Sequence, residues 1–129
     1  MSHRPPRGSQ RRPDPRRALG TLGETLAARH LEREGYRIVG RNVRADGVEI
    51  DLIARRGPWI VFVEVKMRRS RQHGSPEEAV DPRKQQRLRR GARAWLATAR
   101  AGRPRFDVIA LEPDPETGEL RLRHLVAAF

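Results

Sequence analysis

The sequence predicts one α/β domain, a mixed β-sheet of about five strands flanked by helices. Its 129 residues are the length of a typical single domain. Apolar residues recur at helical spacing in two segments, and five other segments have the apolar patterns of strands. The resulting order is helix, three strands, helix and two strands, which indicates a mixed sheet with helices packed on it.

The first segment, residues 1–17, has no periodic apolar pattern and contains six Arg, four Pro and one Asp. Such a composition buries too little apolar surface to fold. We therefore predict a disordered basic tail over residues 1–17 and a folded domain over residues 18–129. The tail is interpreted either as a solvated terminus or as a non-specific anchor for phosphates.

The first helix is predicted from Leu19 to about Glu34. Its apolar positions fall at helical spacing, and they are Leu19, Leu22, Leu26, Ala27 and Leu31. Gly35 follows as a helix C-cap. A loosely alternating strand over residues 36–44 then leads to Asp46-Gly47, a pair typical of tight hairpin turns.

Two strands follow, over residues 48–54 and 59–67. In the first, we expect Val48, Ile50 and Leu52 on one face, and Glu49, Asp51 and Ile53 on the other. The second is apolar on both faces until Glu64, which predicts a strand that is covered on two sides. The turn between them is predicted over residues 55–58, and the site geometry given below is conditional on Arg56 and Gly57 forming its two-residue loop.

A polar loop over residues 68–80 precedes the second helix. Asp81 is its predicted N-cap, Pro82 its first residue, and its end is expected near Arg100. Two further strands are predicted over residues 105–111 and 119–126, separated by a segment rich in turn-forming residues.

The composition excludes several classes of protein. No stretch of about 18 uncharged apolar residues could span a membrane, and no apolar signal-peptide core follows the N-terminus. The absence of cysteine excludes disulfides, thiol nucleophiles and thiolate metal sites, so we expect a cytoplasmic protein. The net charge of +12, carried by 26 Arg and two Lys, favours binding to nucleic acid.

The candidate catalytic residues are Asp51, Glu64 and Lys66. Phosphodiester hydrolysis uses a metal to polarise the phosphate and activate water, and Mg²⁺ (or Mn²⁺) needs only one or two protein carboxylates. Glu64 and Lys66 are two apart and share one face of a strand. With the predicted loop, Asp51 faces Phe62 and lies diagonal to Glu64, so Asp51 and Glu64 could share one ion.

Each of these residues also has a structural interpretation. Asp51 could be an edge residue that faces solvent, and Lys66 could simply neutralise Glu64 as an ion pair. The apolar neighbours of Asp51 favour burial, and a buried carboxylate without a partner is costly. A one-residue shift in register would move Asp51 to the opposite face and remove the site.

The combined pattern of the chain resembles the YraN family of uncharacterised bacterial proteins over residues 18–129. The matching motifs are Gly20-x-x-Gly23-Glu24, Asn42-x-Arg44, Glu-Ile-Asp-Leu-Ile-Ala at 49–54, Phe-Val-Glu-Val-Lys-x-Arg at 62–68, Gly-x-Pro-Glu-Glu-Ala-Val at 74–80, Lys84, Arg-Phe-Asp-Val at 105–108 and His-Leu-x-x-Ala-Phe at 124–129. That family is similar to archaeal-type Holliday-junction resolvases and to restriction-endonuclease-like nucleases, whose active site is an acid followed by Asp/Glu-x-Lys.

The resemblance implies a restriction-endonuclease-like fold and a role for each matching residue. Asp51 and Glu64 would hold the metal, and Lys66 would serve the attacking water. Glu24 would supply a further acid, although Thr21 to Glu24 also fits a capping box at a helix start. Val48 stands where the family usually has Gly, which leaves the role of Glu49 open.

A basic surface is predicted beside these residues. It combines the loop arginines Arg68, Arg69 and Arg71 with one side of the second helix, Arg83, Lys84, Arg87 and Arg90. Such a row is usually a solvated face, but its place next to the acids favours contact with DNA phosphates. The four histidines lack zinc-ligand spacing, and no Walker loop, Ser-His-Asp set or dinucleotide fingerprint is present.

The expected function is Mg²⁺-dependent endonuclease activity on DNA, with branched or structured DNA as the candidate substrate. The alternatives are a basic DNA- or RNA-binding protein that keeps the fold without turnover, and a structural accessory to a nucleoprotein assembly. By resemblance, we also expect a homodimer.

Overall fold

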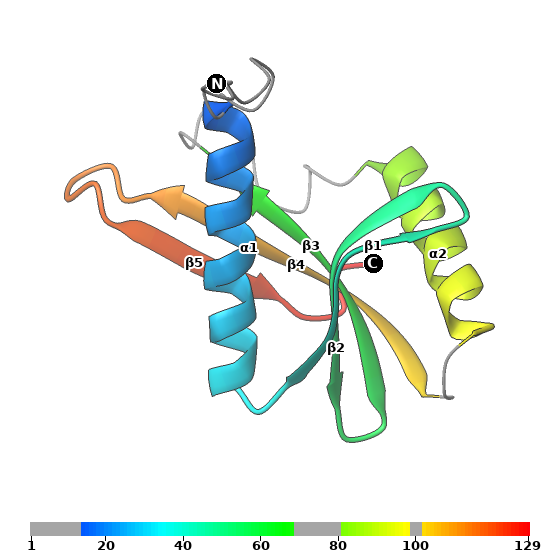
Figure 1. Ribbon diagram of the computed structural model, residues 1–129. Helices are drawn as coiled ribbons and strands as arrows, with labels where there is room; N and C mark the ends of the chain where they lie inside the picture. Colours follow the sequence, from blue (N-terminus) through cyan, green and yellow to red (C-terminus); the bar gives the residue numbers. More distant parts are fainter. Residues whose placement is uncertain (1–13, 69–80, 99–101) are drawn as a thin grey trace, which may run out of the picture.

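The computed structural model describes residues 14–68, 81–98 and 102–129, which form a five-stranded sheet and two helices (Figure 1). The elements are α1 (Pro15–Arg33), β1 (Arg37–Ala45), β2 (Val48–Arg56), β3 (Trp59–Met67), α2 (Pro82–Leu96), β4 (Arg103–Pro113) and β5 (Leu120–Leu125). The strands lie in the order β1-β2-β3-β4-β5, with β3 and β4 parallel and the other neighbours antiparallel. The predicted mixed α/β fold is confirmed. Neither helix in these ranges is long and apolar enough to cross a membrane.

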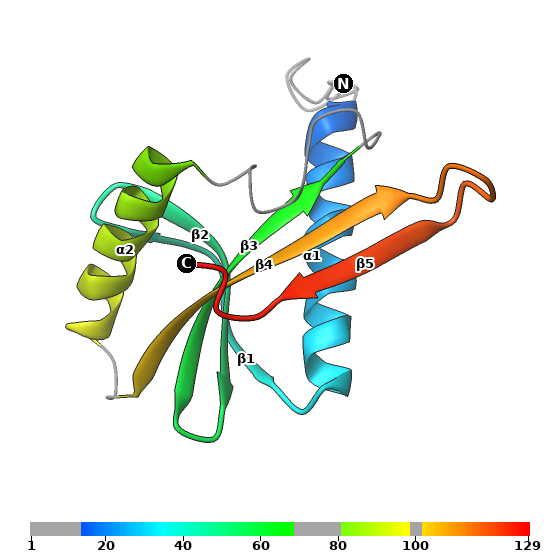
Figure 2. The same cartoon turned by 180° about the vertical axis from the view of Figure 1, so that it is seen from behind.

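The two helices lie on opposite faces of the sheet (Figure 2). They belong to two separate apolar clusters of the described residues. Val61 and Val63 of β3 pack in the cluster of α1, whereas Ile60 and Phe62 pack in the cluster of α2. Because β3 is apolar on both sides, it can contribute to both clusters. The predicted two-sided burial of this strand is therefore confirmed.

Helix α1 begins at Pro15, earlier than the predicted start at Leu19. The dipeptide Asp14-Pro15 precedes the helix in the same way as Asp81-Pro82 precedes α2, because proline fits the first helical position without losing a hydrogen bond. Residues 15–17 of the predicted tail are therefore helical, and residues 1–13 lie outside the described ranges. The helix ends as predicted, with Gly35 at a φ of +89°.

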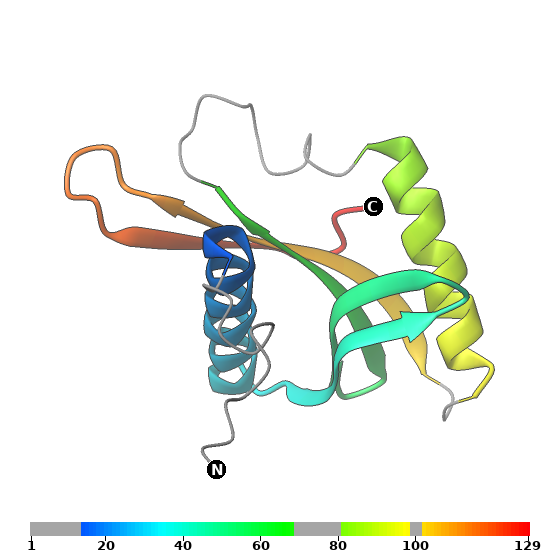
Figure 3. The same ribbon diagram turned by 45° about the horizontal axis from the view of Figure 1, so that its top comes forward.

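Strand β2 bends at Asp51, so the predicted alternation of its faces is wrong. Val48 and Ile50 pack in the cluster of α2, but Leu52 and Ala54 pack in that of α1. The reason is that pairing with β3 ends at Leu52 and Val63. The part of β2 that precedes Leu52 is paired with β1 alone, and this two-stranded ribbon arches towards α2 (Figure 3).

Helix α2 starts where it was predicted to start. The Asp81 side chain accepts a hydrogen bond from the N–H of Lys84 at 2.9 Å, as an N-cap should. The helix ends at Leu96, however, and not near Arg100. Thr98 explains the earlier end, because both its N–H and its hydroxyl donate to the carbonyl of Trp95, at 3.0 and 2.8 Å.

Gly91 of α2 lies against the arched ribbon, which predicts an effect on stability. A Cβ at Gly91 would lie 3.0 Å from the Cβ of Val48, whereas one at Gly20 in α1 would meet nothing within 4 Å. Gly20→Ala should therefore raise the free energy of unfolding by about 0.5–1 kcal/mol through helix propensity. Gly91→Ala should lower it by roughly 1 kcal/mol, because overpacking outweighs the same gain. Urea unfolding of both variants checks this, and equal stabilisation by the two would contradict it.

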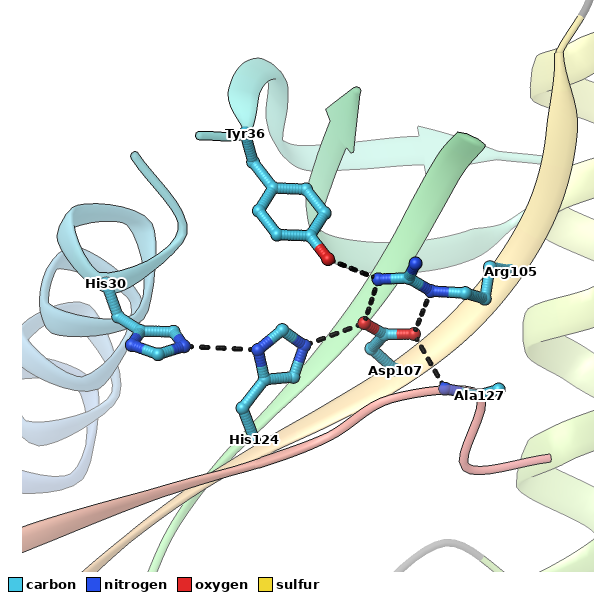
Figure 4. Close-up of polar contacts among 6 residues, drawn as sticks. All are labelled: His30, Tyr36, Arg105, Asp107, His124 and Ala127. Carbon is cyan, nitrogen blue, oxygen red and sulfur yellow. Dashed lines mark hydrogen bonds and ion pairs between the residues drawn. The ribbon is translucent and has the colours of Figure 1, made fainter. Parts of the chain in front are cut away.

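A polar network holds the C-terminal segment to the sheet (Figure 4). Asp107 of β4 is fully buried and accepts two hydrogen bonds from Arg105, at 2.8 and 2.9 Å. It also accepts one from His124 Nε2 at 2.7 Å and one from the N–H of Ala127 at 3.0 Å. Burial alone would raise the pKa of Asp107, but these hydrogen bonds hold that pKa below its usual range.

The same network reaches α1 through a pair of histidines. His124 Nδ1 lies 3.1 Å from Nε2 of His30, and Arg105 also donates to the Tyr36 hydroxyl. Burial lowers the pKa of His30, and the neighbouring His124 lowers it further. The network therefore joins α1, β4, β5 and the chain end, a role for which histidine spacing along the sequence gave no signal.

Candidate active site

The turn between β2 and β3 sets the position of Asp51. Arg56 pairs with Trp59, so the loop residues are Gly57 and Pro58, and the predicted loop of Arg56 and Gly57 is wrong. The register moves by two residues and brings Asp51 level with Glu64, one step beyond the last paired residues. Because side chains alternate with a period of two, this shift changes the partner of Asp51 without turning β3 over.

The Asp51 carboxylate lies at the point where β2 leaves β3. Its Oδ2 accepts the N–H of Val65 at 2.8 Å, in place of a main-chain acceptor from β2. Burial raises the pKa of Asp51 to about 7, the charge of Glu64 adds to the effect, the Val65 N–H opposes it, and the charge of Glu24 raises it again. The two carboxylates therefore lie close enough to repel each other when both are ionised, and a bound cation would relieve that repulsion.

Glu64 holds both lysines of the chain. Its side chain is almost buried, and its Oε1 lies 2.6 Å from Lys84 Nζ and 3.3 Å from Lys66 Nζ. Burial lowers the pKa of Lys66, and the neighbouring Lys84 ammonium lowers it further. Burial alone would also lower the pKa of Lys84, but the hydrogen bond to Glu64 raises it above its usual range.

Asp51, Glu64 and Lys84 line one groove between the arched ribbon and the start of α2, with a volume of about 590 Å³. Its lining residues are Val48, Glu49, Asp51, Glu64, Asp81, Arg83, Lys84, Arg87 and Leu88. A second groove of about 470 Å³ contains Glu24 and Asn42, and Glu49 lines both. Glu49, whose role the sequence left open, thus lies between the candidate pair and Glu24.

Glu24 does not cap a helix. Since α1 begins at Pro15, Thr21 and Glu24 lie inside it, and the capping-box interpretation is wrong. The Thr21 hydroxyl donates instead to the carbonyl of Arg17 at 3.0 Å. Glu24 Oε2 accepts a hydrogen bond from Asn42 Nδ2 at 3.1 Å. The charge of Glu24 is close enough to raise the pKa of Asp51, but Glu24 lines the second groove and not the one that Asp51 and Glu64 share.

The predicted basic residues divide into groups. Arg83 and Arg87 line the groove of the carboxylates, whereas Lys84, predicted for the DNA backbone, points at Glu64. Arg90 pairs with Asp46 at the tip of the ribbon, with Nε 3.1 Å from Oδ2. The N–H of Arg68 donates to the carbonyl of Leu111. Arg69 and Arg71 lie outside the described residues.

A further row of basic side chains runs along α2. It lines a shallow groove of about 550 Å³ formed by Arg83, Gln86, Arg87, Arg89, Arg90 and Arg93. Arg89 and Arg93 were not among the residues that the sequence singled out. The row meets the carboxylate groove at Arg83 and Arg87, so the positive surface continues to the acids.

The donor set of the groove fits a hard divalent cation. Among residues 14–68, 81–98 and 102–129, no three acidic or histidine side chains converge closely enough to hold a metal by themselves. Mg²⁺ keeps several of its waters, however, so two carboxylates suffice for it. The charge of Glu64 is one of the causes that raise the pKa of Asp51, and a cation between the two carboxylates would offset that repulsion.

The raised pKa of Asp51 predicts a dependence of stability on pH. A folded-state pKa of about 7, above the ordinary value of 3.8, means that ionising this carboxyl costs folding free energy. The contribution of Asp51 therefore becomes less favourable as pH rises from about 4 to 7. Asp51→Asn keeps an acceptor for the Val65 N–H and lacks this cost.

The stability of Asp51→Asn relative to the wild type should therefore be higher at pH 8 than at pH 5. Urea unfolding without divalent cations, at both pH values, measures the difference. A difference between the two proteins that stays constant with pH would contradict the assignment.

Comparison with known proteins places the chain among many similar sequences. Residues 23–111 match the family described as uncharacterised protein family UPF0102. A UPF0102 protein of Symbiobacterium thermophilum is 50% identical over 115 residues, covering 88% of this chain and 97% of that protein. UPF0102 proteins of Geobacter sulfurreducens and Rhodococcus jostii are each 48% identical, covering 86% and 81% of this chain and 88% and 93% of theirs.

Proposed function

The chain belongs to the uncharacterised protein family UPF0102, which agrees with its YraN-like motifs. We propose that it is a Mg²⁺-dependent endonuclease that hydrolyses DNA phosphodiester bonds. The observation that carries the proposal is the position of Asp51 and Glu64 in one groove whose wall continues into the arginines of α2, with Lys66 Nζ 3.3 Å from the Glu64 carboxylate. In this proposal, two acids that would hold a metal ion lie beside arginine side chains that would bind phosphates.

Asp51 and Glu64 would hold the metal in this proposal. When bound, Mg²⁺ would polarise the phosphate and lower the pKa of an attacking water. Asp51 is positioned for this by the Val65 N–H, and Glu64 by its place on β3. Arg83 and Arg87 would bind the phosphates on either side of the scissile bond and so orient the DNA backbone.

Lys66 would serve the attacking water. It lies on the same face of β3 as Glu64, and its ammonium is 3.3 Å from the Glu64 carboxylate. Burial lowers the pKa of Lys66, so the neutral amine, which is the form that can accept a proton, is more populated than in an exposed lysine. This lysine would hold the water in line with the phosphate, and in its neutral form it would accept the proton that the water loses.

The alternative is a basic nucleic-acid-binding protein that keeps the fold without turnover. Its support is the group of ion pairs around Glu64, because a carboxylate neutralised by two lysines can also serve a purely structural role. RNA is a second candidate ligand under this alternative. Both hypotheses carry the expectations of a cytoplasmic protein and a homodimer.

A cleavage assay distinguishes the two hypotheses. Linear, flapped and four-way DNA are incubated with wild-type protein and Lys66→Ala, in Mg²⁺, in Mn²⁺ and in a chelator. We expect cutting by the wild type only with a divalent cation, and we expect Lys66→Ala to bind DNA but not to cut it. The preferred substrate among the three forms identifies the DNA shape.

Two outcomes would contradict the proposal. If the wild type binds DNA but cuts none of the three forms in either metal, the non-catalytic alternative holds. If Lys66→Ala loses binding rather than cutting, the lysine belongs to the DNA surface and not to the reacting atoms. Arg93→Ala, at the far end of α2, is the matched control that lowers affinity without lowering the cutting rate at saturating DNA.

A further inference from the structure

The position of Lys84 carries an inference beyond the sequence-based site. The chain uses arginine at 26 of its 28 basic positions, yet both lysines contact the same oxygen of Glu64. The two come from different elements, Lys66 from β3 and Lys84 from the first turn of α2. A compact ammonium fits against one carboxylate oxygen, whereas a planar guanidinium favours paired contacts.

Lys84 is also the nearer of the two. Its Nζ is 2.6 Å from Glu64 Oε1, and the helix start that carries it is fixed by the Asp81 cap. Its side chain therefore crosses the groove from the helix wall to the sheet wall. About a third of that side chain is exposed, and Lys84 itself lines the groove, so open space lies beside it.

We propose that Lys84 is the counter-ion that a divalent cation displaces from Glu64, and that the displaced ammonium then contacts the scissile phosphate. This inference rests on the metal binding in the proposed function. A cation shared by Asp51 and Glu64 would repel an ammonium at the same oxygen, because like charges at such distances interact strongly in a partly buried site. Of the two lysines, only Lys84 lines the groove, so it is the ammonium that can move from Glu64 into the groove.

The displaced lysine has a substrate group to meet. Arg83 and Arg87 line the same groove and would hold the flanking phosphates. An ammonium between them would lie beside the phosphate at which negative charge grows during hydrolysis. Lys84 would thus act as a substrate-contacting residue in the loaded protein and as a substitute for the metal in the free protein.

Calorimetric titration of the full chain with Mg²⁺ alone tests the displacement. Lys84→Met should bind Mg²⁺ about fivefold more tightly than the wild type, because the ion no longer competes with an ammonium. Arg83→Met removes one charge from the same groove and is the matched control, with a smaller gain in affinity. Equal gains in the two variants, or no gain in Lys84→Met, would overturn the inference.

Lysine side-chain NMR gives a second measurement, in which the Mg²⁺ titration is made on the wild-type protein and variants serve only to assign the signals. Protein labelled only at lysine has two side chains to observe, and Lys66→Arg and Lys84→Arg assign them. Saturating Mg²⁺ should move the Lys84 signal to that of a lysine without a carboxylate partner. A Lys84 signal that does not move while Mg²⁺ binds would overturn the inference.

A DNA cleavage assay with Lys84→Met distinguishes failure of this inference from failure of the proposed function. With Mg²⁺ saturating, Lys84→Met should cut DNA at least ~10-fold more slowly than the wild type, since a phosphate contact is lost. A variant that binds Mg²⁺ more tightly and cuts at the wild-type rate overturns the phosphate contact alone. A wild-type protein that binds no Mg²⁺ overturns the proposed function, and the Lys84 displacement with it.

Discussion

Glu64→Gln is expected to lower the rate of DNA cleavage by at least ~100-fold. The amide has nearly the same shape as the carboxylate, so the strand and its burial should be preserved. What it removes is the charge that would hold the cation and that now holds both lysines within 3.3 Å. Single-turnover cleavage at saturating DNA measures this loss, with Glu32→Gln on the exposed side of α1 as the matched control.

Binding of DNA by Glu64→Gln should be equal to that of the wild type or tighter. The substitution removes a negative charge from a groove that would receive phosphates, so repulsion of the backbone decreases. A variant that retains the wild-type cutting rate would show that Glu64 does not belong to the reacting groups. A variant that loses binding together with folding would be identified by its urea unfolding curve.

Asp107→Asn is expected to lower the free energy of unfolding by about 3–5 kcal/mol. Asp107 is fully buried and accepts hydrogen bonds from Arg105, His124 and the N–H of Ala127. The amide leaves the largely buried guanidinium of Arg105 without its counter-charge, and that penalty dominates. Urea unfolding at neutral pH measures the change.

Asp46→Asn is the matched control for this prediction. Its carboxylate is mostly exposed and pairs with Arg90 at the surface, where such pairs contribute about 0–1 kcal/mol. Asparagine also suits the φ of +49° that this turn position adopts. A loss below about 1 kcal/mol in Asp107→Asn would mean that the network is solvated rather than buried. Cleavage by the folded fraction of this variant should be unchanged, since Asp107 does not line the carboxylate groove.

Much of the fold could be predicted because its signals are local. The Asp46-Gly47 turn, the Asp81-Pro82 helix start and the two-sided burial of residues 59–67 each depend on neighbouring residues alone. Asp14-Pro15 carries the same local signal as Asp81-Pro82, but it lies in a segment whose arginines and prolines favoured a tail. The start of α1 could therefore have been predicted from the sequence.

The geometry of the site depends on longer-range structure. The sequence predicted Asp51 near Glu64 and Lys66, but it could not supply the bend at which β2 leaves β3, because this depends on packing of the β1–β2 ribbon against α2. For the same reason Lys84 was interpreted as part of a helix surface. Its scarcity among 28 basic residues was the one sequence signal that could have placed it with Lys66.

The sheet separates two apolar clusters that share no side chain within the described ranges. Substitutions on the α1 side should therefore combine additively with those on the α2 side, because distant sites without common partners rarely couple. Substitutions around Ala27 and Ala28 could thus raise the thermal stability of the protein without changing the packing of the cluster beside α2. The thermal stability contributed by one side of the sheet and the packing behind the carboxylate groove on the other side can therefore change independently.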